Sequence, residues 1–280
     1  MKLFVTGGTG FVGSHFLKLA LDQGHEVLAL RRTGSKPRIP LRGQLIWVDG
    51  ALDGDYRDRL GGVDVLVHLA SHTPNPPYDT LDQCLYWNVF ASMQLARQAA
   101  DQGVKNFIVA GSCFEYGRAA DIGKDVDVET PLEPLCSYPT SKAAASVAFL
   151  GWARECHIHL KLLRIFQVYG EGELATRLWP SLRDAALAGQ DFPMSGGEQV
   201  RDFISVEEVA RQFVRELDFS DTLPGQPLVR HVATGQSQTL LCFVQQWWRH
   251  WGGTGQIVVG AIPYRKNEIM RITTRHNIGL

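Results

Sequence analysis

The segment TGGTGFVG, residues 6–13, decides the fold. It follows the short apolar run KLFV and opens the stretch FVGSHFLKLALDQ, whose apolar residues recur at helical spacing. Gly7, Gly10 and Gly13 therefore lie in a strand-to-helix turn, where a residue without a Cβ atom lets the backbone approach a pyrophosphate closely. The start of the helix adds free N–H groups and a partial positive charge. The pattern predicts a dinucleotide-binding βαβ unit, and the alternative is a tight turn that binds nothing.

Apolar runs and helical stretches continue to alternate along the first 166 residues. The candidate buried strands are residues 63–70, 106–112 and 160–166. The candidate helices are residues 81–103 and 138–155. Strands separated by helices are typical of a Rossmann-type α/β fold with a doubly wound parallel sheet. After Gly170, frequent prolines and glycines indicate shorter elements. We therefore expect a dinucleotide-binding domain over residues 1–166 and a mainly substrate-binding lobe over residues 167–280, interleaved with the sheet domain.

The composition of the 280-residue chain argues against several classes of protein. Its formal net charge of −1 gives no basic field of the kind that binds nucleic acid. No stretch approaches the ~20 apolar residues that span a membrane, and glycines interrupt the apolar N-terminus too early for a signal peptide. The cysteines form no CxxC pair and the histidines show no metal-ligand spacing, so we expect a reduced, cytoplasmic protein without a metal site.

The end of the predicted second strand carries the residues that select the cofactor. A carboxylate at this point would accept a hydrogen bond from the ribose 2′-hydroxyl of NAD, but this sequence has LALRRTGSKPR, with Arg31 and Arg32 there. Arginine binds a 2′-phosphate in a bidentate manner. We therefore expect NADP(H) as the preferred cofactor and NAD(H) as the alternative. Asp49, at the end of the third strand, is a candidate contact for the adenine amino group or a turn residue.

Further motifs follow the glycine loop in a fixed order: DVLVHLAS, GSCFEYG, YPTSK, LLRIFQVYG and VRDFISVEEVA. From residue 2 to about residue 270, the chain resembles an extended short-chain dehydrogenase/reductase of the NAD-dependent epimerase/dehydratase family, whose members act on nucleotide sugars. The resemblance implies a reaction centre of Ser112, Tyr138 and Lys142. It also implies a homodimer that pairs the predicted long helices.

The spacing of Tyr138 and Lys142 suits the chemistry that the resemblance implies. Four residues apart, they lie on one face of a helix that Pro139 is well placed to begin. A lysine ammonium beside a phenol, together with the positive charge of the nicotinamide in the oxidised complex, favours the phenolate, so we expect the pKa of Tyr138 in that complex to fall below its usual ~10. In the reductive direction the phenol gives its proton to the new alkoxide. The resemblance further implies that Lys142 binds the nicotinamide ribose and Ser112 the substrate oxygen.

The resemblance extends to residues around the reaction centre. Asn88 matches an asparagine that steadies the active-site helix, and Arg201 matches an arginine that reaches the substrate diphosphate. The expected cofactor contacts are Gly7, Gly10, Phe11, Val12, Gly13, Arg31, Arg32, Asp49, Leu69, Ala70, Ser71, Asn88, Tyr138, Lys142 and Phe166. The expected substrate contacts are Thr73, Ser112, Cys113, Phe114, Gln167, Arg201 and Arg265.

The cassette GSCFEYG narrows the reaction on the sugar. Sugar 4,6-dehydratases of the family carry carboxylates at the positions of Cys113 and Phe114, and the epimerase–reductases that make GDP-fucose carry a cysteine at the position of Phe114. This chain has neither, and we interpret Glu115 as structural and Cys113 as buried and inert. The resemblance therefore favours NADPH-dependent reduction of a nucleotide-linked 4-keto-6-deoxy or dideoxyhexose. Such enzymes make CDP-linked dideoxysugars or dTDP-6-deoxy sugars for surface polysaccharides such as lipopolysaccharide.

Two alternatives stand beside this reading of the resemblance. One is a nucleotide-sugar 4-epimerase that retains NAD, and the other is a non-catalytic NADP-binding regulator. Regulators on this fold characteristically lose the tyrosine or the lysine, and this chain keeps both. A reductase consumes its reduced nicotinamide one for one with product, whereas an epimerase leaves it unchanged.

Overall fold

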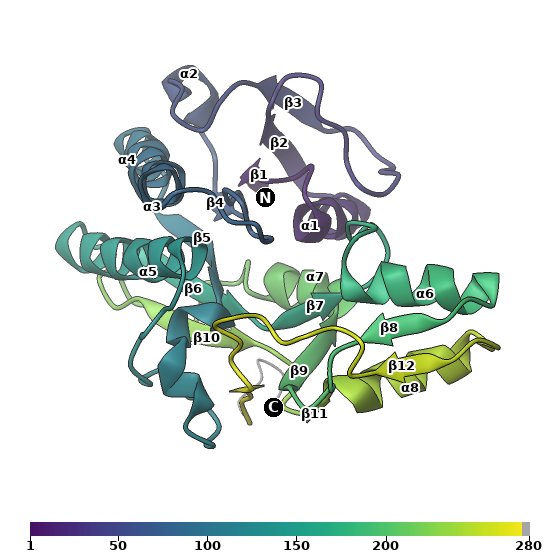
Figure 1. Ribbon diagram of the computed structural model, residues 1–280. Coiled ribbons are helices and arrows are strands. Elements are labelled where there is room, and N and C mark those ends of the chain that lie inside the picture. Colours follow the sequence, from purple (N-terminus) through teal and green to yellow (C-terminus); the bar gives the residue numbers. More distant parts are fainter. Residues whose placement is uncertain (276–280) are drawn as a thin grey trace.

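Seven parallel strands form the central sheet of the computed structural model, which describes residues 1–275 (Figure 1). In spatial order they are β10 (Leu228–Val232), β6 (His159–Ile165), β5 (Asn106–Ser112), β4 (Val65–His68), β1 (Lys2–Thr6), β2 (Glu26–Arg31) and β3 (Ile46–Asp49). Every neighbouring pair in this sheet is parallel. From β1 the chain builds outward to β3 on one side and to β10 on the other, so the sheet is doubly wound. The predicted Rossmann-type α/β fold is confirmed.

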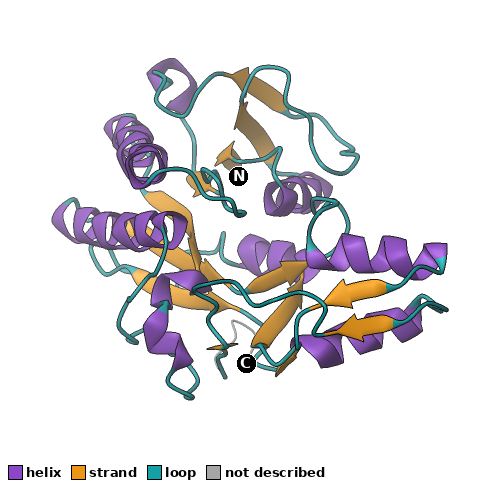
Figure 2. Cartoon of the chain, in the orientation of Figure 1, coloured by secondary structure: helices purple, strands orange, loops and turns teal. Residues whose placement is uncertain are grey.

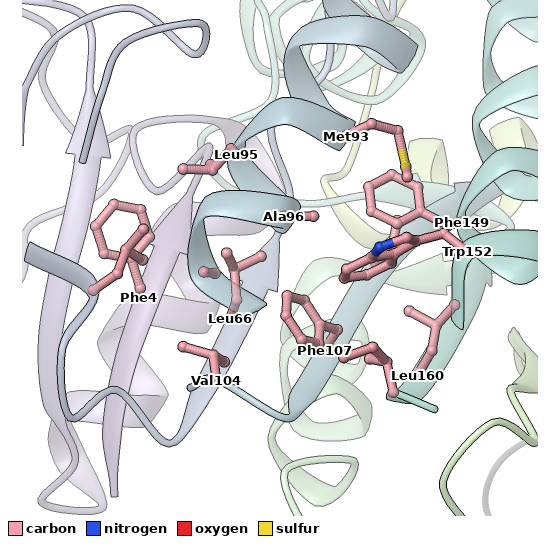
Figure 3. Close-up of a cluster of buried hydrophobic side chains, with 14 of the residues drawn as sticks. Phe4, Leu66, Met93, Leu95, Ala96, Val104, Phe107, Phe149, Trp152 and Leu160 are labelled. Carbon is pink, nitrogen blue, oxygen red and sulfur yellow. The ribbon is translucent and has the colours of Figure 1, made fainter. Parts of the chain in front are cut away.

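Helices cover both faces of this sheet. One face carries α2 (Arg57–Leu60), α4 (Ser92–Asp101) and α5 (Ser137–Glu155). Figure 3 shows the core beneath them, where helix side chains meet strand side chains: Phe4, Leu66, Met93, Phe107, Phe149 and Trp152. The other face carries α1 (Phe11–Asp22) and α7 (Val206–Arg215). Because apolar side chains fill both faces, the inner strands read as continuous apolar runs.

The long helix expected over residues 81–103 contains a change of geometry. It consists of α3 (Leu81–Leu85), a π-helical turn (Tyr86–Ala91) and α4 in one continuous run. π-helical turns occur frequently at functional sites, and this one holds Asn88. Neither this run nor any other helix within the described residues is long and apolar enough to cross a bilayer.

After β6 the chain builds a second, smaller sheet. There β9 (Val200–Ser205) pairs with β7 (Gln167–Tyr169), β11 (Ser237–Thr239) and β13 (Arg271–Ile272), and a separate ribbon joins β8 (Phe192–Met194) to β12 (Ile257–Val259). Helices α6 (Leu178–Ala188) and α8 (Leu240–His250) share a core with this ribbon (Figure 2). In between, α7 and β10 join the central sheet, so the chain crosses between the two parts more than once. Residues 276–280 of the predicted lobe lie outside the described residues.

Candidate active site

The glycine loop lies at the carboxyl end of β1, where the two halves of the sheet diverge. The loop packs directly against the residues that follow β4, because a Cβ atom on Gly7 would lie 2.5 Å from Ala70 N. The loop is also tight within itself, because a Cβ atom on Gly13 would lie 2.1 Å from Gly7 O. Gly7 also has a φ of 74°, which favours glycine. Gly10 precedes the first turn of α1 as its N-cap. Other expected cofactor residues that lie at this loop or against it are Phe11, Val12 and Leu69.

The expected reaction centre lies where β5 meets α5. β5 ends at Ser112, and α5 begins one residue before Tyr138, so two adjacent elements supply the hydroxyl and the Tyr138–Lys142 pair. Ser112, Tyr138 and Lys142 are only 7%, 8% and 5% exposed, respectively. Lys142 Nζ donates to Ala110 O at 2.6 Å. These residues therefore line the interior edge of the sheet, and none of them is an ordinary surface side chain.

Asn88 connects the π-helical turn to the start of α5. Its Nδ2 donates to Ser141 Oγ at 2.9 Å, and its Oδ1 accepts from His72 N at 2.7 Å. Ser141 Oγ in turn donates to Tyr138 O at 2.8 Å. One buried amide thus holds the loop after β4 and the first turn of the active-site helix in a fixed relation.

Burial, rather than Lys142, dominates the ionisation of Tyr138. Burial raises the pKa of the Tyr138 phenol, and the nearby Ser71 hydroxyl opposes this increase only in part. Burial also lowers the pKa of Lys142, and the negative charge of Glu115 opposes this decrease. In the chain alone, the Lys142 ammonium donates to Ala110, and the loss of phenolate hydration outweighs the groups that favour the ionised phenol. The lower pKa expected for the oxidised complex stays a prediction. Tyr138 keeps its proton at neutral pH.

Glu115 is fully buried and joins three elements beneath the reaction centre. The strand ends at Ser112, and the next four residues form a 3₁₀ turn. The Glu115 carboxylate accepts hydrogen bonds from Ser112 N at 2.7 Å, Ser146 Oγ at 2.7 Å and Arg164 Nε at 3.0 Å. Burial raises the pKa of the neighbouring Cys113 to about 12, so that thiol is neutral. This geometry gives Glu115 a structural task and Cys113 no nucleophilic one.

The residues expected to select the cofactor contact one another. Arg31 and Asp49 are opposite in the parallel pair β2–β3, and Arg31 Nε donates to Asp49 Oδ1 at 2.8 Å. The Arg31 guanidinium also lies 4.7 Å from the centroid of the Trp47 ring. Arg32 is exposed and forms no ion pair within residues 1–275. The expectation that Arg31 and Asp49 face a ligand independently is therefore revised, because strand register makes them a pair.

On the substrate side, Arg201 is buried in β9 and bound by the C-terminal segment. It donates to Glu268 Oε1 at 3.1 Å, to Met270 O at 3.2 Å and to Ile269 O. Burial lowers the pKa of Arg201, and the charge of the exposed Arg265 lowers it further. The other expected contacts follow the carboxyl ends of β4, β5 and β6 at the same edge of the sheet: Ser71, Thr73, Phe114, Phe166 and Gln167.

Three side chains that the sequence analysis missed also reach this region. The Tyr78 ring stacks on the Tyr138 ring, with centroids 5.5 Å apart and planes inclined by 28°. Burial raises the pKa of Tyr78, and the charge of Arg177 opposes this increase, so Arg177 lies near that ring. Glu173 pairs with Arg177 at 3.4 Å, and burial raises the pKa of Glu173 to about 7. All three residues lie in loops or at a helix cap, where no periodicity indicates which way a side chain points. The sequence offered one signal, which is that Tyr78 lies in the loop after β4.

The chain is similar to known proteins in sequence and in structure. Residues 3–228 match the profile of the NAD dependent epimerase/dehydratase family. A dTDP-6-deoxy-L-talose 4-dehydrogenase (NAD(+)) from Aggregatibacter actinomycetemcomitans is 27% identical, over 76% of this chain and 78% of the relative. A UDP-glucose 4-epimerase from Corynebacterium glutamicum is 26% identical, over 79% of this chain and 72% of the relative. The solved structure of MoeE5 in complex with UDP-glucose and NAD has a TM-score of 0.83 at 26% identity and covers 98% of this chain and 89% of its own. Because the family profile extends from β1 to the start of β10, the chain belongs to the NAD dependent epimerase/dehydratase family.

Proposed function

We propose that this protein reduces the 4-keto group of a nucleotide-linked 4-keto-6-deoxyhexose or dideoxyhexose, with NADPH as the hydride source. The observation that carries the proposal is the enclosed Tyr138 phenol beside Lys142 and Ser112, because a phenol that keeps its proton is the form that protonates an alkoxide. Next to Ser112 stand Cys113 and Phe114 instead of carboxylates, which argues against dehydration. The dTDP-6-deoxy-L-talose 4-dehydrogenase supports chemistry at C4 of a deoxysugar, and its name specifies NAD(+).

Each residue of the site has one task in this reaction. The glycine loop binds the pyrophosphate through backbone N–H groups, and NADPH, when bound, supplies the hydride. Ser112 Oγ donates a hydrogen bond to the sugar carbonyl oxygen and polarises it. As the carbonyl carbon accepts the hydride, Tyr138 gives its proton to that oxygen, so that the ketone becomes an alcohol. Lys142 holds the ribose hydroxyls, and its charge stabilises the phenolate until a proton from solvent replaces the one transferred.

The proposed preference for NADPH rests on the basic segment after β2. Because Arg31 is bound to Asp49, we assign the 2′-phosphate to the exposed Arg32, with Lys36 and Arg38 close by in the sequence. The Arg31–Asp49 pair also neutralises the carboxylate that would otherwise repel a 2′-phosphate at this point.

A nucleotide-sugar 4-epimerase that retains NAD is the second candidate. Its support is the UDP-glucose 4-epimerase among the relatives, together with the Arg31–Asp49 pair, because an arginine held by a carboxylate is less available to a phosphate. A regulator that binds NADP without turnover is the candidate from another class, and it would not need the Tyr138 phenol.

Cofactor stoichiometry separates these functions. The protein is mixed with NADPH and with 4-keto-6-deoxyglucose linked to CDP, dTDP, GDP or UDP, and the absorbance of the reduced nicotinamide is followed beside product formation. A reductase consumes one NADPH for each 4-hydroxy product with at least one of these substrates. A parallel mixture holds the protein, NAD and UDP- or dTDP-glucose, and conversion of that sugar to its 4-epimer at constant absorbance would contradict the proposal and favour the epimerase. Absence of both reactions would favour the regulator.

We further propose a homodimer through the helical run 81–101 and α5. Leu81, Phe90 and Val147 on these helices are 43%, 66% and 63% exposed, so both helical segments present large apolar side chains to solvent. Light scattering should give the mass of a dimer for the wild type and of a monomer for Phe90→Asp. A monomeric wild type would contradict this assignment.

A further inference from the structure

Tyr78 is placed against the side chain that the proposed reaction uses most directly. Its ring stacks on the ring of Tyr138, with centroids 5.5 Å apart and an interplanar angle of 28°. It is itself half-buried, in the loop that follows β4. Figure 1 shows this loop reaching into the centre of the molecule, between the central sheet and the C-terminal part of the chain.

The loop that carries Tyr78 is fixed to the active-site helix. Asp79 O accepts a hydrogen bond from Ser137 Oγ at 2.7 Å, so the residues next to Tyr78 and Tyr138 are joined as well. The Asp79 carboxylate is 2.8 Å from His72 Nε2, and His72 N donates to Asn88 Oδ1 at 2.7 Å. These bonds therefore fix the backbone next to Tyr78 relative to the start of α5, and the Tyr78 ring is already in position before a ligand binds.

The charges of two arginines of the substrate region act on Tyr78. Burial raises the pKa of Tyr78, Cys136 and Glu268 raise it further, and the charges of Arg265 and Arg177 oppose the increase. The charge of Arg265 also acts on Arg201.

A nucleotide sugar must span the distance between these two groups. Its C4 carbonyl has to reach Tyr138, and its diphosphate is attracted to the arginines, so the hexose ring between them passes Tyr78. The C–H groups of a hexose face and the methyl group of a 6-deoxy sugar are apolar, and an aromatic ring is a suitable surface for both.

We propose that Tyr78 is the sugar platform of this enzyme, a specificity-determining residue whose ring packs against the hexose of the nucleotide sugar. This inference rests on the proposed function. It assigns to Tyr78 the recognition of the sugar and leaves recognition of the nucleoside diphosphate to other residues. It follows that the Tyr78 ring matters for sugar-linked ligands and has no effect on the free diphosphate.

Calorimetric titration of the NADP⁺-loaded protein tests this assignment. Each of CDP, dTDP, GDP and UDP is compared with its 4-keto-6-deoxyglucose-linked form, for the wild type and for Tyr78→Ala, Tyr78→Phe and Tyr86→Ala. Tyr86 is a partly exposed tyrosine of the π-helical turn and serves as the matched control. We expect Tyr78→Ala to weaken binding of the nucleotide sugar about tenfold and to leave that of the matching diphosphate within about twofold. Tyr78→Phe, which keeps the ring, and Tyr86→Ala should bind both ligands as the wild type does.

The possible failures are distinguishable. If Tyr78→Ala weakens diphosphate and nucleotide sugar equally, or neither of them, the platform is wrong although the proposed function stands. If the wild type binds none of the four nucleotide sugars, the proposed function is wrong and the platform fails with it. Wild-type cofactor affinity in Tyr78→Ala shows that the variant has kept its fold.

Discussion

Replacement of Glu115 by glutamine should destabilise the protein far more than its single side chain suggests. Glu115 and Arg164 are 0% and 3% exposed and form an ion pair at 3.0 Å. Removal of one partner from a buried ion pair costs about 3–5 kcal/mol, because it leaves a charge buried without compensation. Glutamine still accepts from Ser112 N, so we expect the lower end, about 3 kcal/mol. With a urea m-value of about 3 kcal/mol/M, the unfolding midpoint should fall by about 1 M.

Two further variants decide whether the ion pair is the cause. Glu208→Gln breaks the partly exposed Glu208–Arg211 pair and should cost less than about 1 kcal/mol. The double variant Glu115→Gln/Arg164→Met removes both buried charges and should recover at least half of the lost free energy of unfolding. A Glu115→Gln midpoint that equals that of Glu208→Gln, or a double variant as unstable as the sum of its single variants, would refute this reasoning.

Three more predictions concern the cofactor and a second buried carboxyl group. Gly13→Ala should abolish dinucleotide binding in a fluorescence titration, because its Cβ atom would lie 2.1 Å from Gly7 O; binding within twofold of the wild type contradicts this. Arg32→Ala should raise the KM for NADPH about tenfold and leave that for NADH unchanged, and equal effects on both would rule out the phosphate contact. Burial raises the pKa of Glu173 to about 7 from an ordinary 4.5. Between these two pH values the carboxyl group of the unfolded chain has lost its proton while that of the native state still holds it. The free energy of unfolding therefore falls by up to about 3 kcal/mol as the pH rises from 4.5 to 7. Glu173→Gln should therefore raise the Tm at pH 8 and not at pH 4, and an unchanged Tm at pH 8 would contradict the shift.

The sheet domain could be predicted because its signals are local. Buried strands such as β4 and β5 are continuous apolar runs, and the glycine loop sets the first strand-to-helix turn without help from distant residues. β10 was missed because its sequence LVRHV is short and half polar, and its partner β6 lies far away in the chain. The π-helical turn was missed because it lies between two α-helical segments and its sequence YWNVFA has no glycine or proline to mark it.

Some parts of the candidate site could likewise be predicted from local sequence, and others depend on how the chain folds. Tyr138 and Lys142 share a helix, so their spacing alone predicts that they lie on one face. The Arg31–Asp49 and Arg201–Glu268 pairs depend on strand register and on the path of the C-terminal segment, neither of which can be read from composition or periodicity. The burial that raises the pKa of Tyr138 in the chain alone likewise follows from the fold and has no signal in the local sequence.

Proton transfer from Tyr138 is the step on which the proposed reaction depends, and single-turnover reduction by Tyr138→Phe tests it most directly. Phenylalanine keeps the ring that stacks on Tyr78 and removes only the hydroxyl. With NADPH and the nucleotide-linked 4-keto sugar that the wild type reduces, hydride transfer should slow by about 10²–10⁴-fold while the affinity for NADPH stays within about twofold. A rate within threefold of the wild type at unchanged NADPH affinity would contradict the account.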